Sequence, residues 1–249
     1  ADSGYRVCLV DLDPQAHASL HLGLDLAEHD PSIYDVLTGA ATLADGRHRI
    51  NERLWLIPSL LDLAAAEIEL VGEVGREVIL RDKLVEDDGN FDFVIIDCPP
   101  SLGVLTVNAL TAVREVFLPL QPHFLALHGL SKLLWTVEMV QQRLNPSLRL
   151  SGVVLCLYES GTRLAAEVSD DVEAFFRKRA KTSDARAQTR IFATRIRRNI
   201  RLAEAPSFGQ SIFEYAPQSN GAQDYRALTD ELIDQQLEQL PLRTWDVAQ

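Results

Sequence analysis

Short, uninterrupted apolar runs alternate along this sequence with segments whose apolar residues recur at helical spacing. The clearest run is FDFVIID, at Phe91–Asp97. Uninterrupted rather than alternating hydrophobicity indicates strands that are buried on both faces. Strands separated by helices favour right-handed βαβ crossovers and a parallel sheet. We therefore predict an α/β fold, a three-layer, doubly wound domain with a mostly parallel sheet.

The same pattern gives approximate bounds for each element. The expected strands are Arg6–Leu12, Leu54–Pro58, Phe91–Asp97, Glu115–Leu120, Ser151–Leu157, Arg190–Ile196 and Ser211–Phe213. The expected helices are Asp62–Val71, Gly75–Glu86, Leu102–Val113, Leu127–Leu144, Arg163–Arg179 and Gln223–Leu240. No linker rich in proline, glycine or serine divides these elements, so we expect a single domain over residues 1–249.

Composition excludes several classes of protein. No apolar run approaches the roughly 18 residues that a membrane span needs, and the N-terminus lacks the pattern of a secretory signal. Three cysteines, Cys8, Cys98 and Cys156, lie inside apolar runs and form neither a metal-binding spacing nor an even disulfide set. We therefore predict a protein of the reducing cytoplasm with no membrane partner.

The charge is unevenly distributed. A net charge of −12 argues against a protein that coats nucleic acid with its whole surface. Residues 177–201 invert that balance, because they hold ten basic side chains and one acidic residue, Asp184. A compact basic segment on an acidic body is a candidate site for phosphate backbones. The alternative interpretation is a solvated helix face followed by a loop.

Carboxylates follow two of the expected strands. Asp11 and Asp13 lie in DLDPQ, and Asp97 opens DCPPS. Open parallel sheets bind ligands at the carboxyl ends of their strands. An acid that closes a buried strand is a common ligand for the water shell of Mg²⁺ in phosphate-binding NTPases. The alternative, an aspartate that only caps the next helix, is weakened by the second strand end with its Asp-x-Asp.

Longer stretches carry a family resemblance. They include VCLVDLDPQAHASLHLGL, SIYDVLTG, LWLIPSLLDLAAAEIELV, FDFVIIDCPPSLGVLTVNALTA and RNIRLAEAPSFGQSI, and they extend over about residues 6–240. In content and order they resemble the ParA/Soj family of deviant-Walker ATPases, which segregate chromosomes and plasmids. IDCPPSLG and RNIRLAEAPSFG are highly specific within the wider MinD/ParA superfamily. The resemblance implies a P-loop NTPase-like fold of the deviant Walker subclass that uses ATP and Mg²⁺.

The resemblance also implies roles for the strand-end carboxylates. Asp97 would bind Mg²⁺ through water, and Asp11 would support the same metal shell. Asp13 would help to place the attacking water, which makes Asp13 and Asp11 the implied catalytic residues. Two segments would respond to loss of the γ-phosphate, the first with Pro14 and Gln15 and the second with Pro99, Pro100 and Ser101.

Two further sites are implied beyond the later strands. The adenine pocket would include Tyr158, Arg197, Arg198 and Asn199. DNA would be bound without sequence specificity by Arg198, Arg201 and the preceding basic segment, which holds Lys178, Lys181 and Arg195. The family pattern further implies that ATP pairs two protomers into a homodimer on nucleoid DNA, and that a ParB-like partner stimulates hydrolysis.

The largest departure from the family concerns the phosphate loop. Family members place a strand, a KGGVGKT-like loop and a helix before the stretch that matches residues 4–7, and no glycine here begins G-x-x-x-x-G-K-[ST]. Either the sequence lacks its natural start, or this is a degenerate homologue. We favour the first, because loss of a central strand beside Phe91–Asp97 would leave apolar strand edges unpaired. We expect the full-length protein to hydrolyse ATP, and this 249-residue form neither to bind ATP tightly nor to hydrolyse it.

Two smaller departures from the family pattern lie in the predicted sites. The first switch reads QAHAS where the family more often has QGNAT, and Arg197 stands where proline is common.

Two alternative functions stay open. One is a non-hydrolysing scaffold, and the other is a relative that positions other cargo. The acidic segment Gln223–Leu240 argues against a membrane-targeting helix. We favour a partition ATPase of the cytoplasm and nucleoid.

Overall fold

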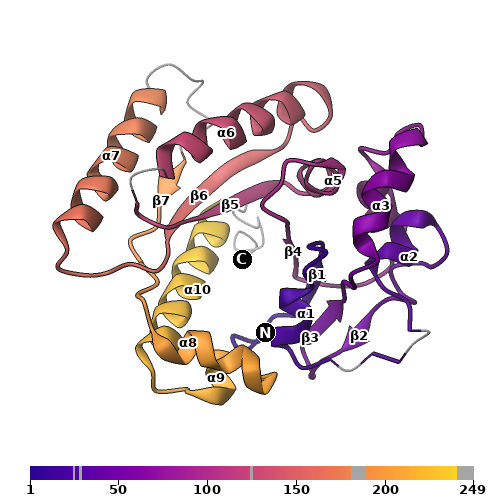
Figure 1. The fold of residues 1–249 in the computed structure, drawn as a ribbon, viewed down its shortest axis with the longest axis horizontal. Helices are drawn as coiled ribbons and strands as arrows, with labels where there is room; N and C mark the ends of the chain where they lie inside the picture. Colours follow the sequence, from indigo (N-terminus) through magenta and orange to yellow (C-terminus); the bar gives the residue numbers. More distant parts are fainter. Residues whose placement is uncertain (25, 28–29, 124–125, 181–188, 240–249) are drawn as a thin grey trace, which may run out of the picture. The chain divides into compact units, whose positions relative to one another are not determined.

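The computed structural model describes every residue except 25, 28–29, 124–125, 181–188 and 240–249 (Figure 1). Its contacts divide the chain into two compact units. The first comprises Ala1–Val116, His128–Leu150 and Glu204–Ser211, and the second comprises Phe117–Leu127, Ser151–Ala203 and Ile212–Gln249. The expectation of one domain over the whole chain stays a prediction.

The first unit contains a four-stranded sheet in the order β2-β3-β1-β4 (Figure 1). The strand β1 (Val7–Asp11) pairs in parallel with β3 (Leu54–Ile57) on one side and with β4 (Phe93–Asp97) on the other. Only β2 (His48–Arg49) is antiparallel, to β3. The α/β class with mostly parallel pairing is therefore confirmed.

Apolar residues of this sheet and of four helices form one core. Val10 of β1 packs with Leu63 of α3 and Leu105 of α5, all fully buried. A capping box starts α2, in which Ser32 accepts from the backbone of Tyr34 and Asp35 accepts from that of Ser32. The helical elements of this unit are α1 (His17–His21), α2 (Ile33–Thr38), α3 (Leu63–Glu69), η1 (Leu70–Gly72), α4 (Ile79–Glu86), α5 (Val104–Ala112), most of α6 (Ala126–Arg143) and η2 (Ala205–Phe208).

A second sheet has the order β5-β6-β7, and most of its residues belong to the second unit. Its strands are β5 (Glu115–Leu120), β6 (Arg149–Leu155) and β7 (Arg190–Ile191), with β7 parallel to β6. Val154 and Phe192 pack against Leu228 and Leu232 in the core of this unit. Its helices are α7 (Arg163–Ala180), α8 (Ile200–Glu204), α9 (Ile212–Tyr215) and α10 (Asn220–Gln239).

One expectation about burial was wrong. We predicted that Phe91–Asp97 would be buried on both faces, but Val94 is 41% exposed and Ile95 is 52% exposed. The physical reason is that β4 is the last strand of its sheet and pairs only with β1 among the described residues. The expected single sheet is likewise two separate sheets in the described part of the chain.

Most other differences concern boundaries. The segment expected as a strand at Ser211–Phe213 forms the helix α9, with Ile212 buried beneath its single turn. The strand expected over Arg190–Ile196 ends at Ile191, and the two-residue β2 was not predicted. The cysteines are free thiols, as expected. Every helix in the described part of the chain is too short or too polar to cross a bilayer.

Candidate functional site

Two of the predicted carboxylates meet at the carboxyl edge of the first sheet. Asp11 ends β1 and Asp97 ends β4, and the parallel register places the two residues side by side. The chain is held there by the Leu12 amide, which donates to the Asp97 carbonyl at 2.8 Å. This juxtaposition follows from parallel pairing, because carboxyl ends of neighbouring parallel strands share one edge.

Asp11 is fully buried, and it accepts all its described hydrogen bonds from Asp13 and Ser19. Its Oδ2 accepts from the Ser19 backbone at 2.8 Å and from the Ser19 hydroxyl at 2.7 Å. Its Oδ1 accepts from the Asp13 amide at 3.3 Å. The Ser19 hydroxyl also accepts from the Ser59 amide at 3.1 Å. A single carboxylate therefore fixes the end of β1, the helix α1 and the segment after β3.

Sequence reasoning missed Ser19 as a site residue. The usable signal was the small hydroxyl at the last position of QAHAS, where the family more often has threonine. Either hydroxyl can donate to a buried carboxylate while accepting from a backbone amide. Ser19 thus links the predicted first switch to Asp11 through two hydrogen bonds.

The predicted first switch lies in a turn that begins at Asp13. The Asp13 Oδ1 accepts from the Gln15 amide at 2.9 Å, and its carbonyl accepts from the Ala16 amide at 2.8 Å. Pro14 lies inside this turn. Ala16 then adopts φ 54°, a left-handed conformation that favours glycine. Glycine is the residue that the family more often has at this position.

The carboxylates create a strongly negative site. Burial raises the pKa of Asp97 above its usual range, and the charges of Asp11 and Asp13 raise it further. A cation bound beside these carboxylates would therefore reduce the repulsion between their negative charges. No group of three or more His, Cys, Asp or Glu side chains in the described ranges is arranged to hold a metal directly. Mg²⁺ fits such a site, since it commonly binds through one or two carboxylates and keeps several waters.

The predicted second switch leaves the same edge. Pro99, Pro100 and Ser101 lead from β4 toward α5, and the Thr106 hydroxyl donates to the Ser101 carbonyl at 2.5 Å. Burial and the neighbouring Asp97 raise the pKa of Cys98 to about 12. The Cys98 thiol is therefore protonated at neutral pH and does not act as a nucleophile.

The second unit gathers the predicted nucleotide residues around Tyr158. The Tyr158 amide donates to the Ile196 carbonyl at 3.0 Å, and the Arg198 amide donates to the Tyr158 carbonyl at 3.1 Å. Arg195 donates to the Tyr158 hydroxyl at 2.7 Å, with its guanidinium 4.6 Å from the ring centre. Leu157, just before Tyr158, has φ 50°. Strained residues of this kind cluster at functional sites.

Two of the predicted nucleotide residues have polar groups that are already engaged. The Arg197 guanidinium is forked onto Asp224 of α10, with Nη2 2.6 Å from Oδ1. The Asn199 Oδ1 accepts from the Arg201 amide at 2.8 Å, which caps the start of α8. Their roles toward a nucleotide stay predictions.

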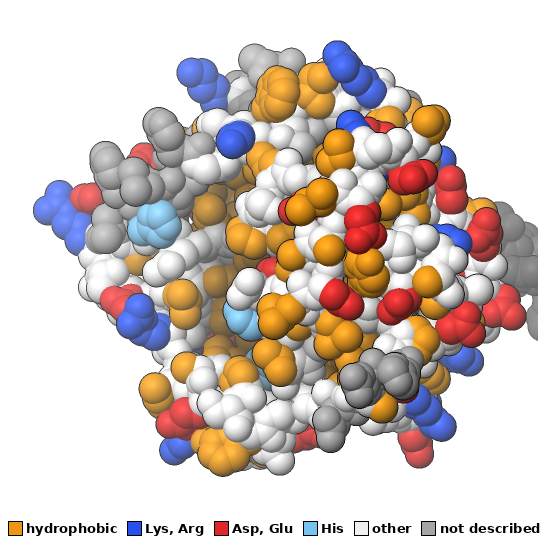
Figure 2. Space-filling model, turned by 45° about the vertical axis from the view of Figure 1, so that its right-hand side comes forward, with side chains coloured by type: hydrophobic (Ala, Val, Ile, Leu, Met, Phe, Trp, Pro, Cys, Tyr) orange, Lys and Arg blue, Asp and Glu red, His pale blue; other side chains and the backbone are white. Residues whose placement is uncertain are grey.

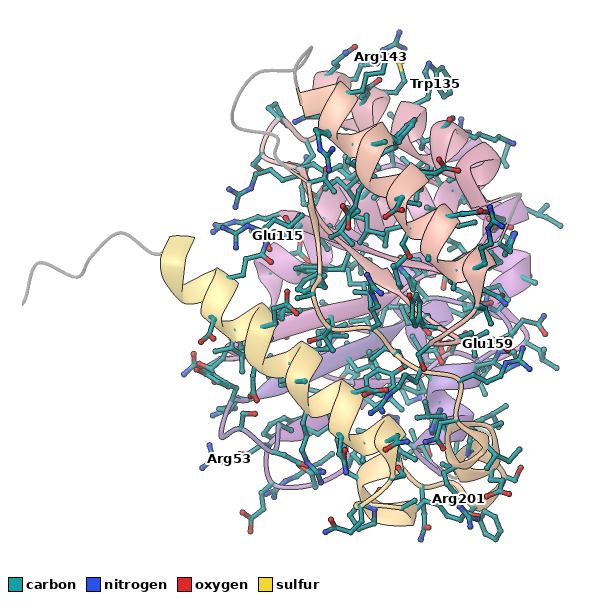
Figure 3. The ribbon with its side chains drawn as sticks, turned by 90° about the vertical axis from the view of Figure 1, so that its left-hand side faces the viewer. Arg53, Glu115, Trp135, Arg143, Glu159 and Arg201 are labelled. Carbon is teal, nitrogen blue, oxygen red and sulfur yellow. The ribbon has the colours of Figure 1, made fainter. Side chains whose placement is uncertain are left out.

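The predicted DNA-binding residues differ in exposure. Arg198 is paired with Glu159 at 3.0 Å, and both side chains are more than half exposed, so the pair is a weak one. Arg201 and Lys178 are exposed on α8 and α7, and Figure 3 labels Arg201 and Glu159. Arg195 is half-buried against Tyr158. Lys181 lies outside the described residues.

Comparison with known proteins gives extensive similarity. A family model described as an AAA domain matches residues 1–150. The sporulation initiation inhibitor protein Soj of Bacillus subtilis is 43% identical over 92% of this chain and 87% of its own length. The chromosome partitioning protein ParA of Myxococcus xanthus is 38% identical over 98% of this chain and 82% of its own.

A solved structure is also similar. The crystal structure of cobyrinic acid a,c-diamide synthase from Mycobacterium smegmatis with bound ATP analog and magnesium has a TM-score of 0.77. It is 37% identical and covers 95% of this chain and 85% of that one.

Proposed function

The chain belongs to the ParA/Soj family of chromosome-partitioning ATPases, and from that premise we propose that it is a nucleotide-timed switch for DNA segregation. In this proposal, ATP with Mg²⁺ closes a homodimer on nucleoid DNA in the cytoplasm. A ParB-like partner then stimulates hydrolysis of ATP to ADP and phosphate, and the dimer releases the DNA.

The observation that carries the proposal is the pairing of Asp11 with Asp97 at one sheet edge. Asp97 would hold the water shell of Mg²⁺, and Asp13 would orient the attacking water. Asp11 would act as a positioning residue, because its described hydrogen bonds go to Ser19 and Asp13. Bound Mg²⁺ would neutralise charge on the phosphates.

The network around Ser19 supports a switch at this edge. Ser19 lies in α1, directly after the turn that Asp13 begins, and it also holds the Ser59 amide. A change in charge beside Asp13 would therefore be felt by α1 and by the segment that leads into α3. Switch segments of nucleotide-hydrolysing proteins respond to the γ-phosphate in this local way.

DNA binding is assigned to the second unit. Arg198 and Arg201 are exposed there, and the segment 177–201 is strongly basic. Guanidinium groups bind phosphate oxygens through paired hydrogen bonds, with no need to read the bases. Contact with DNA would require Arg198 to leave Glu159, which costs little because the pair is solvated.

Magnesium binding can be tested by thermal unfolding. We expect MgCl₂ to stabilise the protein by about 1.4 kcal/mol at ten times its Kd, and Asp97→Asn to abolish this effect. Asp88→Asn is the matched control, since Asp88 is an exposed aspartate of the same unit outside the site. Equal stabilisation of the wild type and Asp97→Asn would contradict the metal role of Asp97.

DNA binding can be tested separately by fluorescence anisotropy with duplex DNA at several salt concentrations. We expect Arg198→Glu to weaken binding and to flatten the dependence of affinity on salt. Arg163→Glu is the control, because Arg163 is 92% exposed in the same unit and lies outside the basic segment. Unchanged affinity and salt dependence in Arg198→Glu would remove the DNA role of this residue.

A further inference from the structure

The helix α3 and the turn η1 are apolar on two opposite sides. Leu63, Ala66 and Leu70 face the core and are buried. A second apolar stripe, offset from the first by two residues, is exposed and consists of Leu61, Ala64, Ile68 and Val71. Both stripes follow the spacing i, i+3, i+7, which places each on one side of a helix.

The exposure along the second stripe is high. Leu61 is 77% exposed, Ile68 is 78% exposed and Val71 is 63% exposed, and Val74, two residues after η1, is fully exposed. Single exposed apolar residues are ordinary, but a contiguous set of them marks an interaction site. We call these four residues, together with Ala64, the α3 face. The buried stripe already packs α3 against the core of the first unit, so the α3 face is not needed for that packing.

An open groove continues the α3 face toward α5. Its volume is about 480 Å³, and its lining combines apolar side chains with charged ones. The apolar residues are Val71, Leu102, Val104 and Val107, and the charged ones are Glu67, Arg76 and Glu77. Helix α3 packs closely there, since a Cβ on Gly103 would collide with the Glu67 carboxylate. The apolar stripe and the groove therefore form one elongated surface, of the kind that receives an amphipathic helix.

Acidic side chains border this surface. Residues 60–77 hold five carboxylates and one basic residue, Arg76, whose charge is offset by Glu77 at 3.1 Å. Figure 2 shows hydrophobic side chains interspersed with acidic ones where the right-hand side of Figure 1, with α2 and α3, comes forward. The acidic side chains are Asp62, Glu67, Glu69, Glu73 and Glu77. An acidic border favours a basic partner and speeds its approach.

We propose that the α3 face and its groove bind an amphipathic helix of a partner protein, with apolar residues on one side and Lys or Arg flanking them. A second copy of this chain fits less well. A two-fold contact would set the α3 face against itself, and it would bring the same five carboxylates together. The contact needs neither nucleotide nor DNA, so its test is independent of those above.

The test uses a fluorescent helical peptide of about 14 leucine and lysine residues, with leucines at i, i+3, i+4 and i+7. Its matched control is the same peptide with glutamate in place of lysine. We expect the Leu/Lys peptide to bind and Ile68→Gln to weaken it about tenfold or more. Val85→Gln should leave the affinity unchanged, because Val85 is 79% exposed on α4 outside the α3 face.

A charge variant provides a second route should Ile68→Gln fail to fold. The double variant Glu67→Gln, Glu73→Gln should weaken the Leu/Lys peptide and reduce the salt sensitivity of its binding. Equal binding of the Leu/Glu peptide would overturn the proposal, as would unchanged affinity in both variants. Loss of self-association in Ile68→Gln, measured by sedimentation, would assign the α3 face to a second copy instead.

Discussion

Asp11 shows how a charge is tolerated at the end of a buried strand. A fully buried carboxylate is costly unless donors surround it, and here three donors reach it from two residues, Asp13 in the turn after β1 and Ser19 in α1. Asp13 directly precedes the proposed first switch, and Ser19 ends its QAHAS stretch. The residue that makes β1 end in an acid therefore also sets the shape of the loop that follows.

Replacing Ser19 with alanine should reveal this coupling. Ser19→Ala removes a donor to Asp11 and leaves the Ser59 amide without its acceptor, so we expect the free energy of unfolding to fall by about 1–3 kcal/mol. Urea unfolding at pH 7 measures the change. Ser207→Ala, at an exposed serine of the same unit, should change it by less than about 0.5 kcal/mol. A loss in Ser19→Ala as small as in Ser207→Ala would show that the network is not structural.

Asp97 should make stability depend on pH. Its pKa is raised in the folded state by burial and by Asp11 and Asp13. The protonated form therefore stabilises the fold at low pH, and this contribution is lost as pH rises through the raised pKa. We expect Asp97→Asn to be more stable than the wild type at pH 7, with the difference shrinking below that pKa. Thermal unfolding over pH 4–8 without Mg²⁺ measures this, and a variant less stable than the wild type at pH 7 would contradict it.

At the scale of elements, the segment that runs from the end of β1 through α1 is held at both ends. Its far end is Gly23, which meets Gly209, directly after η2, and α1 contacts η2. Both glycines have positive φ, 64° and 60°. A Cβ on Gly23 would lie 2.7 Å from the Gly209 carbonyl oxygen. The atoms that this Cβ would meet belong to the backbone of Gly209, so the clash could not be relieved by moving a side chain.

We therefore expect Gly23→Ala to destabilise the protein by about 2–4 kcal/mol, from the positive φ and from the clash. Gly39→Ala is the matched control, since Gly39 has φ 83° and a Cβ added there would meet no atom within 4 Å. The difference between the two variants in their loss of unfolding free energy, measured with urea, gives the cost of the clash between Gly23 and Gly209. Equal losses of stability in the two variants would mean that the backbone at Gly209 shifts to make room for the added Cβ at no cost in free energy.

Elements differ in how far the sequence could predict them. Continuous apolar runs located β1, β3 and β4, and parallel pairing then predicted that Asp11 and Asp97 share an edge. The two-residue β2 and the one-turn α9 carry too few residues to show a period. The Gly23–Gly209 contact joins residues far apart in the sequence, and no local pattern encodes such a pair. Exposure of β4 depends on which strands pair with it, which its own residues do not specify.

At the scale of the whole molecule, charge sets the conditions for the proposed DNA binding. The chain carries −12 overall, although residues 177–201 are strongly basic. Close contacts between arginine and phosphate persist at physiological salt, where charges more than about 8 Å apart are screened. At about 0.01 M salt the screening length grows to about 30 Å, and the acidic remainder of the molecule then repels DNA as well.

Two opposing effects of salt follow from this distribution. Release of counterions from DNA makes the logarithm of affinity fall linearly with the logarithm of salt concentration. Repulsion by the acidic remainder grows as salt is removed, so the line should flatten or turn over below about 0.05 M. A triple variant, Glu52→Gln, Glu73→Gln, Asp88→Asn, removes three negative charges outside the basic segment. In this variant the plot of log affinity against log salt concentration should stay linear at low salt. Its slope above about 0.1 M should be unchanged, because the phosphate contacts are the same. Anisotropy titrations from about 0.01 to 0.3 M salt decide the question, and a straight wild-type line over that whole range would show that the acidic remainder plays no part.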